Sequence, residues 1–176
     1  CFHDTKANRP MDVDRSGMFQ QAELEHILHT IPWFIELSEN QIENLASIVN
    51  IRHIHQGDFI FREGDSEGNI YILLDGEVNI DIQIPGREKV CIFKAEPLDI
   101  IGWSSLTPMV RQRTASAQAV QDSNCLEFDS EALTVFCEED PKLGYIIMKR
   151  ISNLVASRLL TTRIQLMDQI LKSEPS

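Results

Sequence analysis

Between residues 50 and 128 the apolar positions recur every second residue, which is the period of a β-strand with one buried face. The segment Val78–Ile84 alternates apolar and polar residues without interruption. Similar short runs occupy residues 51–55, 58–62, 69–74, 88–94, 113–120 and 124–128, and turn-forming glycine, proline, asparagine and aspartate separate them. The pattern predicts a mainly β domain in which about seven or eight short antiparallel strands form a sandwich or jelly-roll barrel.

Helical spacing frames this β region on both sides. Before it, apolar residues recur at helical spacing over residues 18–30, Pro32 ends the run, and Ser38 with Gln41 forms a capping box that starts a second helix. After it, Asp129 starts a helix over residues 131–138. Pro141 then stands in the first turn of a long helix, which we expect to end near residue 171.

The long helix carries an apolar stripe formed by Ile147, Ile151, Leu154, Val155, Leu159, Leu166 and Ile170. One face of a small barrel is too short to cover such a stripe, and a second copy of the same helix is the simplest cover. We therefore predict a parallel homodimer through residues 141–171. The alternative is a helix folded back entirely onto its own barrel.

These patterns divide the chain into three parts. Residues 1–16 are polar and lack periodicity, so they are predicted to form a disordered arm. Residues 17–140 are predicted to hold the N-terminal helices and the β-barrel, and residues 141–176 the long C-terminal dimerisation helix.

One segment interrupts the barrel with a different chemistry. Gly102 opens a very short helix, Ser104 and Ser105 follow it, and Arg113 begins the next apolar strand. Free N–H groups at a helix start, serine hydroxyls and a guanidinium are groups that together hold an anion. The segment therefore predicts a phosphate-binding site. The alternative role for Arg113 is a structural ion pair with a carboxylate such as Asp99.

Composition narrows the classes of function. The chain has 176 residues, about one domain, and a net charge of −11, so neither nucleic acid nor a membrane surface is an expected partner. A bound anion needs a locally basic pocket, for which the candidate residues are Arg111, Arg113, Arg158 and Arg163. The four cysteines lack the close spacing of a metal site, so no metal site is predicted. They are expected to be buried free thiols, which fits the reducing environment of the cytoplasm. Since no nucleophile-elbow, zinc-helix or Walker motif is present, the chain is not expected to be an enzyme.

Several glycine-centred motifs make the chain resemble a known family over residues 32–171. They are Gly57-Asp58, Phe61-x-Glu-Gly64-Asp65, Tyr71-Ile-Leu-x-x-Gly76-x-Val78, and the segment from Gly102 to Arg113-Thr114-Ala115. With the long helix, this pattern resembles the cyclic nucleotide-binding domain, above all the sensor half of the catabolite activator/fumarate-nitrate regulator (Crp/Fnr) family. The resemblance implies a double-stranded β-helix (jelly-roll) barrel with flanking helices and a long dimerisation helix.

The resemblance also implies a ligand and the residues that bind it. Cyclic AMP or cyclic GMP is the implied ligand, and no cofactor is required. The phosphate would contact Gly102, Ser104, Ser105, Arg113 and Thr114. The purine would meet hydroxyls of the long helix, at or near Thr161 and Thr162.

Trp103 departs from the family pattern, which has a glutamate directly after the glycine. In the family that glutamate accepts a hydrogen bond from the ribose 2′-hydroxyl, whereas an indole has only an N–H to donate. Losing this hydrogen bond would weaken binding by roughly tenfold to a hundredfold. Trp103 could instead stack on the base or fill the sugar pocket.

Two functions remain open on this reading. The first is a sensor that binds a cyclic nucleotide or related phosphorylated molecule and transmits binding to the dimer helix. The second is a degenerate barrel that serves as a dimerisation scaffold without binding nucleotide. The family's transcription factors continue into a helix-turn-helix domain, and no such motif is seen here, so either an output protein or a missing output domain would read the signal.

Overall fold

The structure is a computed structural model that describes residues 13–66, 68–86, 88–107 and 112–173. It forms two compact units, which divide between Ser47 and Ile48. The first unit contains α1 (Val13–Thr30), the short 3-10 helix η1 (Pro32–Phe34) and α2 (Glu39–Ala46). The predicted capping box at the start of α2 is confirmed, because Ser38 and Gln41 exchange hydrogen bonds between side chain and backbone.

The prediction of a disordered arm over residues 1–16 is wrong at its end. Helix α1 begins at Val13, so residues 13–16 are helical, and residues 1–12 lie outside the described residues. Extending a helix adds one backbone hydrogen bond for each residue fixed, so a helix can continue into a polar stretch that shows no apolar period.

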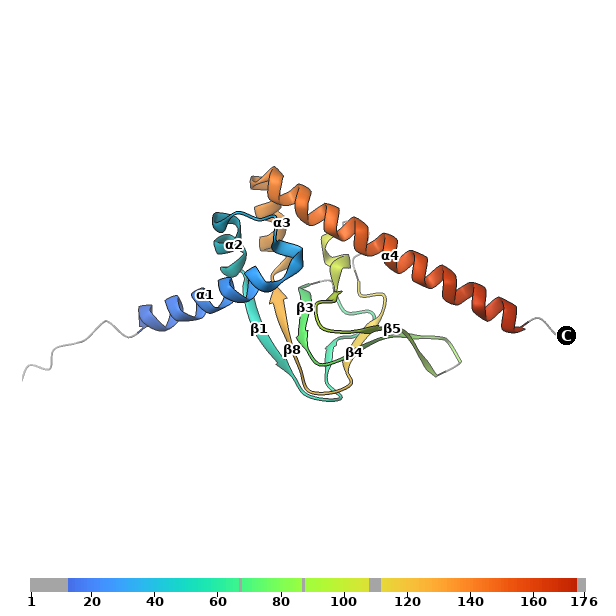
Figure 1. Ribbon diagram of the computed structural model, residues 1–176. Coiled ribbons are helices and arrows are strands. Elements are labelled where there is room, and N and C mark those ends of the chain that lie inside the picture. The colour runs from blue at the N-terminus through green and yellow to red at the C-terminus, as the bar shows by residue number, and fades with distance from the viewer. Residues whose placement is uncertain (1–12, 67, 87, 108–111, 174–176) are drawn as a thin grey trace, which may run out of the picture. The chain divides into compact units, whose positions relative to one another are not determined.

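The second unit contains two four-stranded antiparallel sheets, as the mainly β jelly-roll prediction required (Figure 1). One sheet has the order β1-β8-β3-β6, and the other has the order β2-β7-β4-β5. The strand bounds are β1 (Val49–Ile54), β2 (Phe59–Phe61), β3 (Ile70–Asp75), β4 (Val78–Gln83), β5 (Lys89–Ala95), β6 (Ile100–Ile101), β7 (Ser116–Ala119) and β8 (Ser123–Phe128).

Side chains from all eight of these strands form one hydrophobic cluster in the second unit. Its fully buried members include Leu73, Val78, Ala117 and Cys125. Burial raises the pKa of the Cys125 thiol to about 12, so this cysteine behaves as a small apolar side chain, as expected. Cys91 is exposed on β5, which corrects the expectation that it is a buried thiol.

Two helices complete this unit, α3 (Ser130–Glu139) and α4 (Pro141–Ser173). They pack closely because α4 has a glycine at position 144: a Cβ there would lie 2.6 Å from the carbonyl oxygen of Cys137. Leu143, Ile147 and Ile151 in the first part of α4 are buried. Beyond them the helix runs on past the sheets (Figure 1).

The predicted apolar stripe of α4 is buried in the first half of the helix and exposed in the second half. Ile147 and Ile151 are buried, whereas Leu159 is 60% exposed and Leu166 is 55% exposed. The helix is therefore not folded back entirely onto the barrel, since the sheets do not reach its last turns. Within the described residues, none of the helices combines the length and apolar character that a membrane span requires.

Candidate functional site

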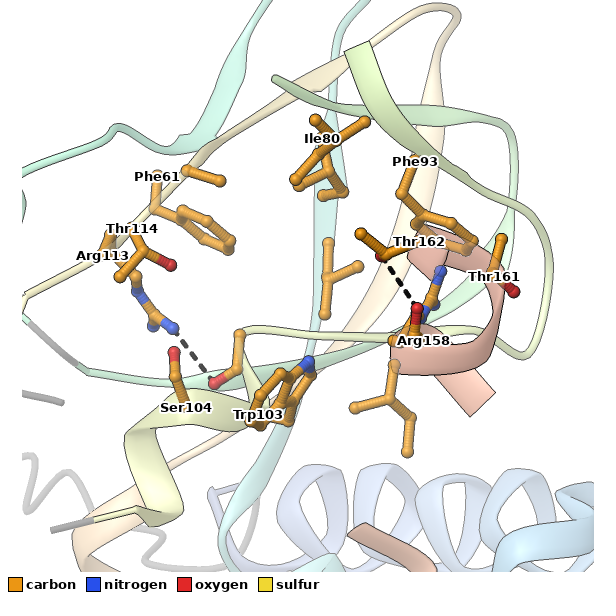
Figure 2. Close-up of a pocket in the computed structure, with 15 residues that line it drawn as sticks. Phe61, Ile80, Phe93, Trp103, Ser104, Arg113, Thr114, Arg158, Thr161 and Thr162 are labelled. Atoms are coloured by element: carbon orange, nitrogen blue, oxygen red, sulfur yellow. Dashed lines mark hydrogen bonds between the residues drawn. The ribbon is translucent and has the colours of Figure 1, made fainter. Parts of the chain in front are cut away.

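A cavity of about 240 Å³ opens in the second unit between the sheets, the short helix η2 (Trp103–Leu106) and α4. Its floor and walls are largely apolar, and are formed by Phe61, Ile80, Ile92, Phe93, Ile100 and Ile101. Polar side chains stand at two ends of it. Figure 2 shows Ser104, Arg113 and Thr114 at one end and Arg158, Thr161 and Thr162 at the other, with Trp103 between them.

The cavity gathers all but one of the residues that the sequence assigned to the site. The exception is Ser105, which does not line it. The Ser105 hydroxyl donates to the carbonyl oxygen of Gly102 at 3.0 Å and lies 3.4 Å from that of Asn69. Ser105 therefore supports the backbone of this segment rather than lining the cavity. We call Gly102, Ser104, Arg113 and Thr114 the anion cradle.

Arg113 is the structural centre of the anion cradle. Its side chain is only 4% exposed, yet it carries a charge. Nη1 donates to the carbonyl oxygen of Gly102 at 3.0 Å, and Nη2 donates to that of Asn69 at 2.6 Å. The guanidinium also lies over the ring of Phe61, 4.3 Å from its centroid. Hydrogen bonds and a ring face allow the charge to be buried at a tolerable cost.

Gly102 is required at its position for two reasons. Its φ of +74° lies in the left-handed region, which side chains disfavour. A Cβ at this position would also lie 2.8 Å from Nη1 of Arg113 and 2.9 Å from the carbonyl oxygen of Asn69. The absence of a side chain at Gly102 therefore makes room for the Arg113 guanidinium. The two residues, which the sequence places eleven positions apart in one motif, are in direct contact.

The backbone of Arg113 is held by a turn far away in the sequence. Its N–H donates to the carbonyl oxygen of Asp65, and its own carbonyl accepts from the N–H of Gly64, both at 2.8 Å. Strand β7 begins only at Ser116, so the prediction that Arg113 starts a strand is wrong. The backbone of Arg113 therefore pairs with a loop rather than with a sheet neighbour, and its side chain lines the cavity.

Asn69 is fixed in turn by a polar group that the sequence analysis did not identify. Its side-chain amide donates to Glu127 Oε1 at 2.9 Å, and Arg52 lies 3.3 Å from the same oxygen. Tyr71 stands beside this pair, and burial with the nearby Glu127 carboxylate raises its pKa to about 12. These residues lie on β1, β3 and β8 or next to them, so only the assembled sheet brings them together.

The proposed ion pair between Arg113 and Asp99 is not formed as expected, because Asp99 faces a different arginine. Nη2 of Arg158 on α4 lies 3.5 Å from Asp99 Oδ1. The Arg158 guanidinium stacks on the ring of Phe93. Burial lowers the pKa of Arg158, and the Asp99 carboxylate acts in the opposite direction. Asp99 therefore links the segment before Gly102 to the long helix.

The other two basic candidates are Arg111 and Arg163. Arg163 is exposed and does not line the cavity, and Arg111 lies outside the described residues. Trp103 lines the cavity directly after Gly102, so no carboxylate stands at that position. Within the described part of the chain no cluster of three metal-ligating side chains is found.

Comparison with known proteins shows which proteins share the sequence and the fold of this chain. A family model described as the cyclic nucleotide-binding domain matches residues 51–140, just over half of the chain. A cGMP-dependent protein kinase of Drosophila melanogaster is 26% identical over 119 residues, which cover 66% of this chain and 13% of the kinase. An anaerobic regulatory protein of Haemophilus influenzae is 27% identical over 123 residues, which cover 69% of this chain and 47% of the regulator.

Solved structures agree with these matches. A cyclic nucleotide-binding domain from Methylobacillus flagellatus is 25% identical, with a TM-score of 0.70 over 89% of this chain and 85% of that one. The chain spans half or less of the length of the curated relatives named above. The activities of those whole proteins therefore do not transfer from the match alone.

The buried hydrogen bonds of Arg113 predict a large structural effect of its removal. Replacing it in R113M deprives two carbonyl oxygens of charged donors, each worth about 1.5–3 kcal/mol. We expect the free energy of unfolding, measured by urea denaturation, to fall by at least about 2 kcal/mol. The matched control is R62M, because Arg62 is exposed and its guanidinium lies over the ring of Phe59. Equal effects of the two substitutions would contradict the structural role of Arg113.

Proposed function

The chain belongs to the cyclic nucleotide-binding domain family, and from this premise we propose that it is a ligand-sensing regulatory module. It binds a cyclic nucleotide or a related phosphorylated molecule in the cavity and transmits the binding to α4. The relatives that support this role include a cGMP-dependent protein kinase and a bacterial anaerobic regulator.

The observation that carries the proposal is the position of the anion cradle. It combines a buried guanidinium, a glycine whose missing side chain makes room for that guanidinium, and the Ser104 and Thr114 side chains at one end of a cavity. Charge-assisted hydrogen bonds of this kind are well suited to a phosphate. Arg113 is already oriented by two backbone carbonyls, so little reorganisation is needed when the anion arrives.

Transmission to α4 follows from the shape of the same cavity. A ligand whose phosphate lies in the anion cradle contacts Arg158, Thr161 and Thr162 of α4 with its other end. Binding can change the helix arrangement only if the ligand favours one arrangement over another. A cavity with walls from both the sheets and the helix meets that requirement, because moving α4 alters the ligand's contacts.

A second candidate function has an observation in its favour. The Arg113 guanidinium already donates to protein carbonyls, and Trp103 lines the cavity where the family's sugar-binding carboxylate would stand. On this reading the domain is a dimerisation scaffold that has lost its nucleotide. The two functions differ in whether any nucleotide binds, which a direct titration decides.

Isothermal titration calorimetry with cyclic AMP and cyclic GMP tests the sensor. We expect saturable binding that S104A weakens roughly tenfold, because it removes a hydroxyl that lines the cavity. S152A serves as the matched control, since Ser152 is an exposed serine of α4 that does not line the cavity, and a change of less than about threefold is expected. No heat of binding with either nucleotide would reject the sensor and favour the scaffold.

We also propose that α4 pairs with a second copy of itself, as its exposed side chains suggest. A line of apolar residues recurs at intervals of four, three and four positions and remains uncovered: Leu160, Ile164, Met167 and Leu171 are 57%, 67%, 61% and 69% exposed. This spacing is that of a coiled-coil seam. The predicted stripe does not include these residues, because it extends the buried face of the first half of α4.

The substitution I164E tests the proposed dimer. It places a charge in the seam, where burial without a partner costs several kcal/mol, so sedimentation equilibrium should show a shift from dimer to monomer. Q165E adds the same charge one position away and should leave the dimer unchanged, since position 165 is off this line. A wild-type chain that sediments as a monomer throughout a concentration series would contradict the proposal.

A further inference from the structure

The α4 end of the cavity contains an unsatisfied hydrogen-bond donor. Nη1 of Arg158 is buried, and within the described residues no acceptor lies in reach of it. Nη2 of the same guanidinium lies 3.5 Å from Asp99 Oδ1, and its plane stacks on Phe93. A buried donor without an acceptor costs free energy until something supplies one. The side chain is 21% exposed and forms part of the cavity wall, so a bound molecule is in a position to do so.

The two threonines beside Arg158 offer the opposite chemistry. The hydroxyl of Thr161 donates to the carbonyl oxygen of Ser157 at 3.1 Å, and that of Thr162 donates to the carbonyl oxygen of Arg158 at 2.9 Å. With their hydrogens used within the helix, these oxygens are left to accept. The α4 end of the cavity therefore offers a guanidinium donor with hydroxyl acceptors three and four residues further along the same helix.

We infer that Arg158 is a specificity-determining residue which makes the cavity select a purine with a 6-keto group, so that cyclic GMP is preferred to cyclic AMP. This inference rests on the proposed function and names its ligand. The Watson–Crick edge of guanine presents the O6 acceptor beside two donors, N1–H and the 2-amino group. One acceptor and two donors are the chemical complement of one donor from Arg158 and two acceptors from Thr161 and Thr162.

Adenine presents a poorer match to the same three groups. Its 6-amino group brings hydrogens to the place where Arg158 has only hydrogens to offer, since a guanidinium has no acceptor. Arginine is for this reason the usual partner of guanine rather than of adenine where proteins read bases. We expect the Arg158 side chain to turn toward the cavity that it lines, so that Nη1 meets the keto oxygen.

Cyclic inosine monophosphate provides the sharpest probe, because it differs from cyclic AMP only in having the 6-keto group and N1–H. Calorimetry should show cyclic GMP and cyclic inosine monophosphate binding roughly tenfold or more tightly than cyclic AMP. In R158M the preference for the keto ligands over cyclic AMP should disappear. The control R163M alters an exposed arginine of the same helix outside the cavity and should retain the preference.

A second variant guards against a folding defect. R158K keeps a positive charge beside Asp99 but lacks the planar fork, so we expect it to lower the keto preference at least about threefold while its thermal midpoint stays close to that of the wild type. Equal or tighter binding of cyclic AMP by the wild type, or a preference unchanged in R158M, would overturn the inference and leave the sensor standing. Failure of all three nucleotides to bind would instead overturn the proposed function, and this inference with it.

Discussion

The donation of two hydrogen bonds by Arg113 to the carbonyl oxygens of Gly102 and Asn69 is the interaction on which the site depends. A buried guanidinium is stable only where acceptors meet it, and here the acceptors come from two different parts of the chain. The requirement explains why position 102 has no side chain and why Asn69 is held by Glu127. It also leaves a positive charge fixed at one end of a cavity whose floor and walls are largely apolar.

The other end of the cavity is formed by α4, which carries Arg158. Arg158 belongs to a helix whose far half is left exposed by the described residues of its own chain, and it faces the Asp99 carboxylate three residues before Gly102. Movement of α4 would therefore change both the Asp99 contact and the wall of the cavity. In this arrangement a ligand that spans both ends couples the anion cradle to the helix, and the apolar line on α4 couples the helix to a second copy.

The sequence predicted the elements of this fold better than its long-range contacts. Alternation located seven of the strands, and the capping box located α2, because each depends on neighbours within a few residues. Strand β6 was missed, since its two residues are too few to show a period. The grouping of Asn69 with Glu127 could not be read from the sequence, because it depends on the register of β3 against β8. Arg158 was recognised as a candidate charge, but its partners Asp99 and Phe93 follow only from the packing of α4.

The most direct test of the account is a crystal structure of the chain grown with cyclic GMP. The account predicts the cyclic phosphate within hydrogen-bonding distance of Ser104 and of Arg113, and the guanine directed at Arg158 with its keto oxygen. A nucleotide bound elsewhere on the chain, or one seated with its base in the anion cradle and its phosphate against α4, would contradict it.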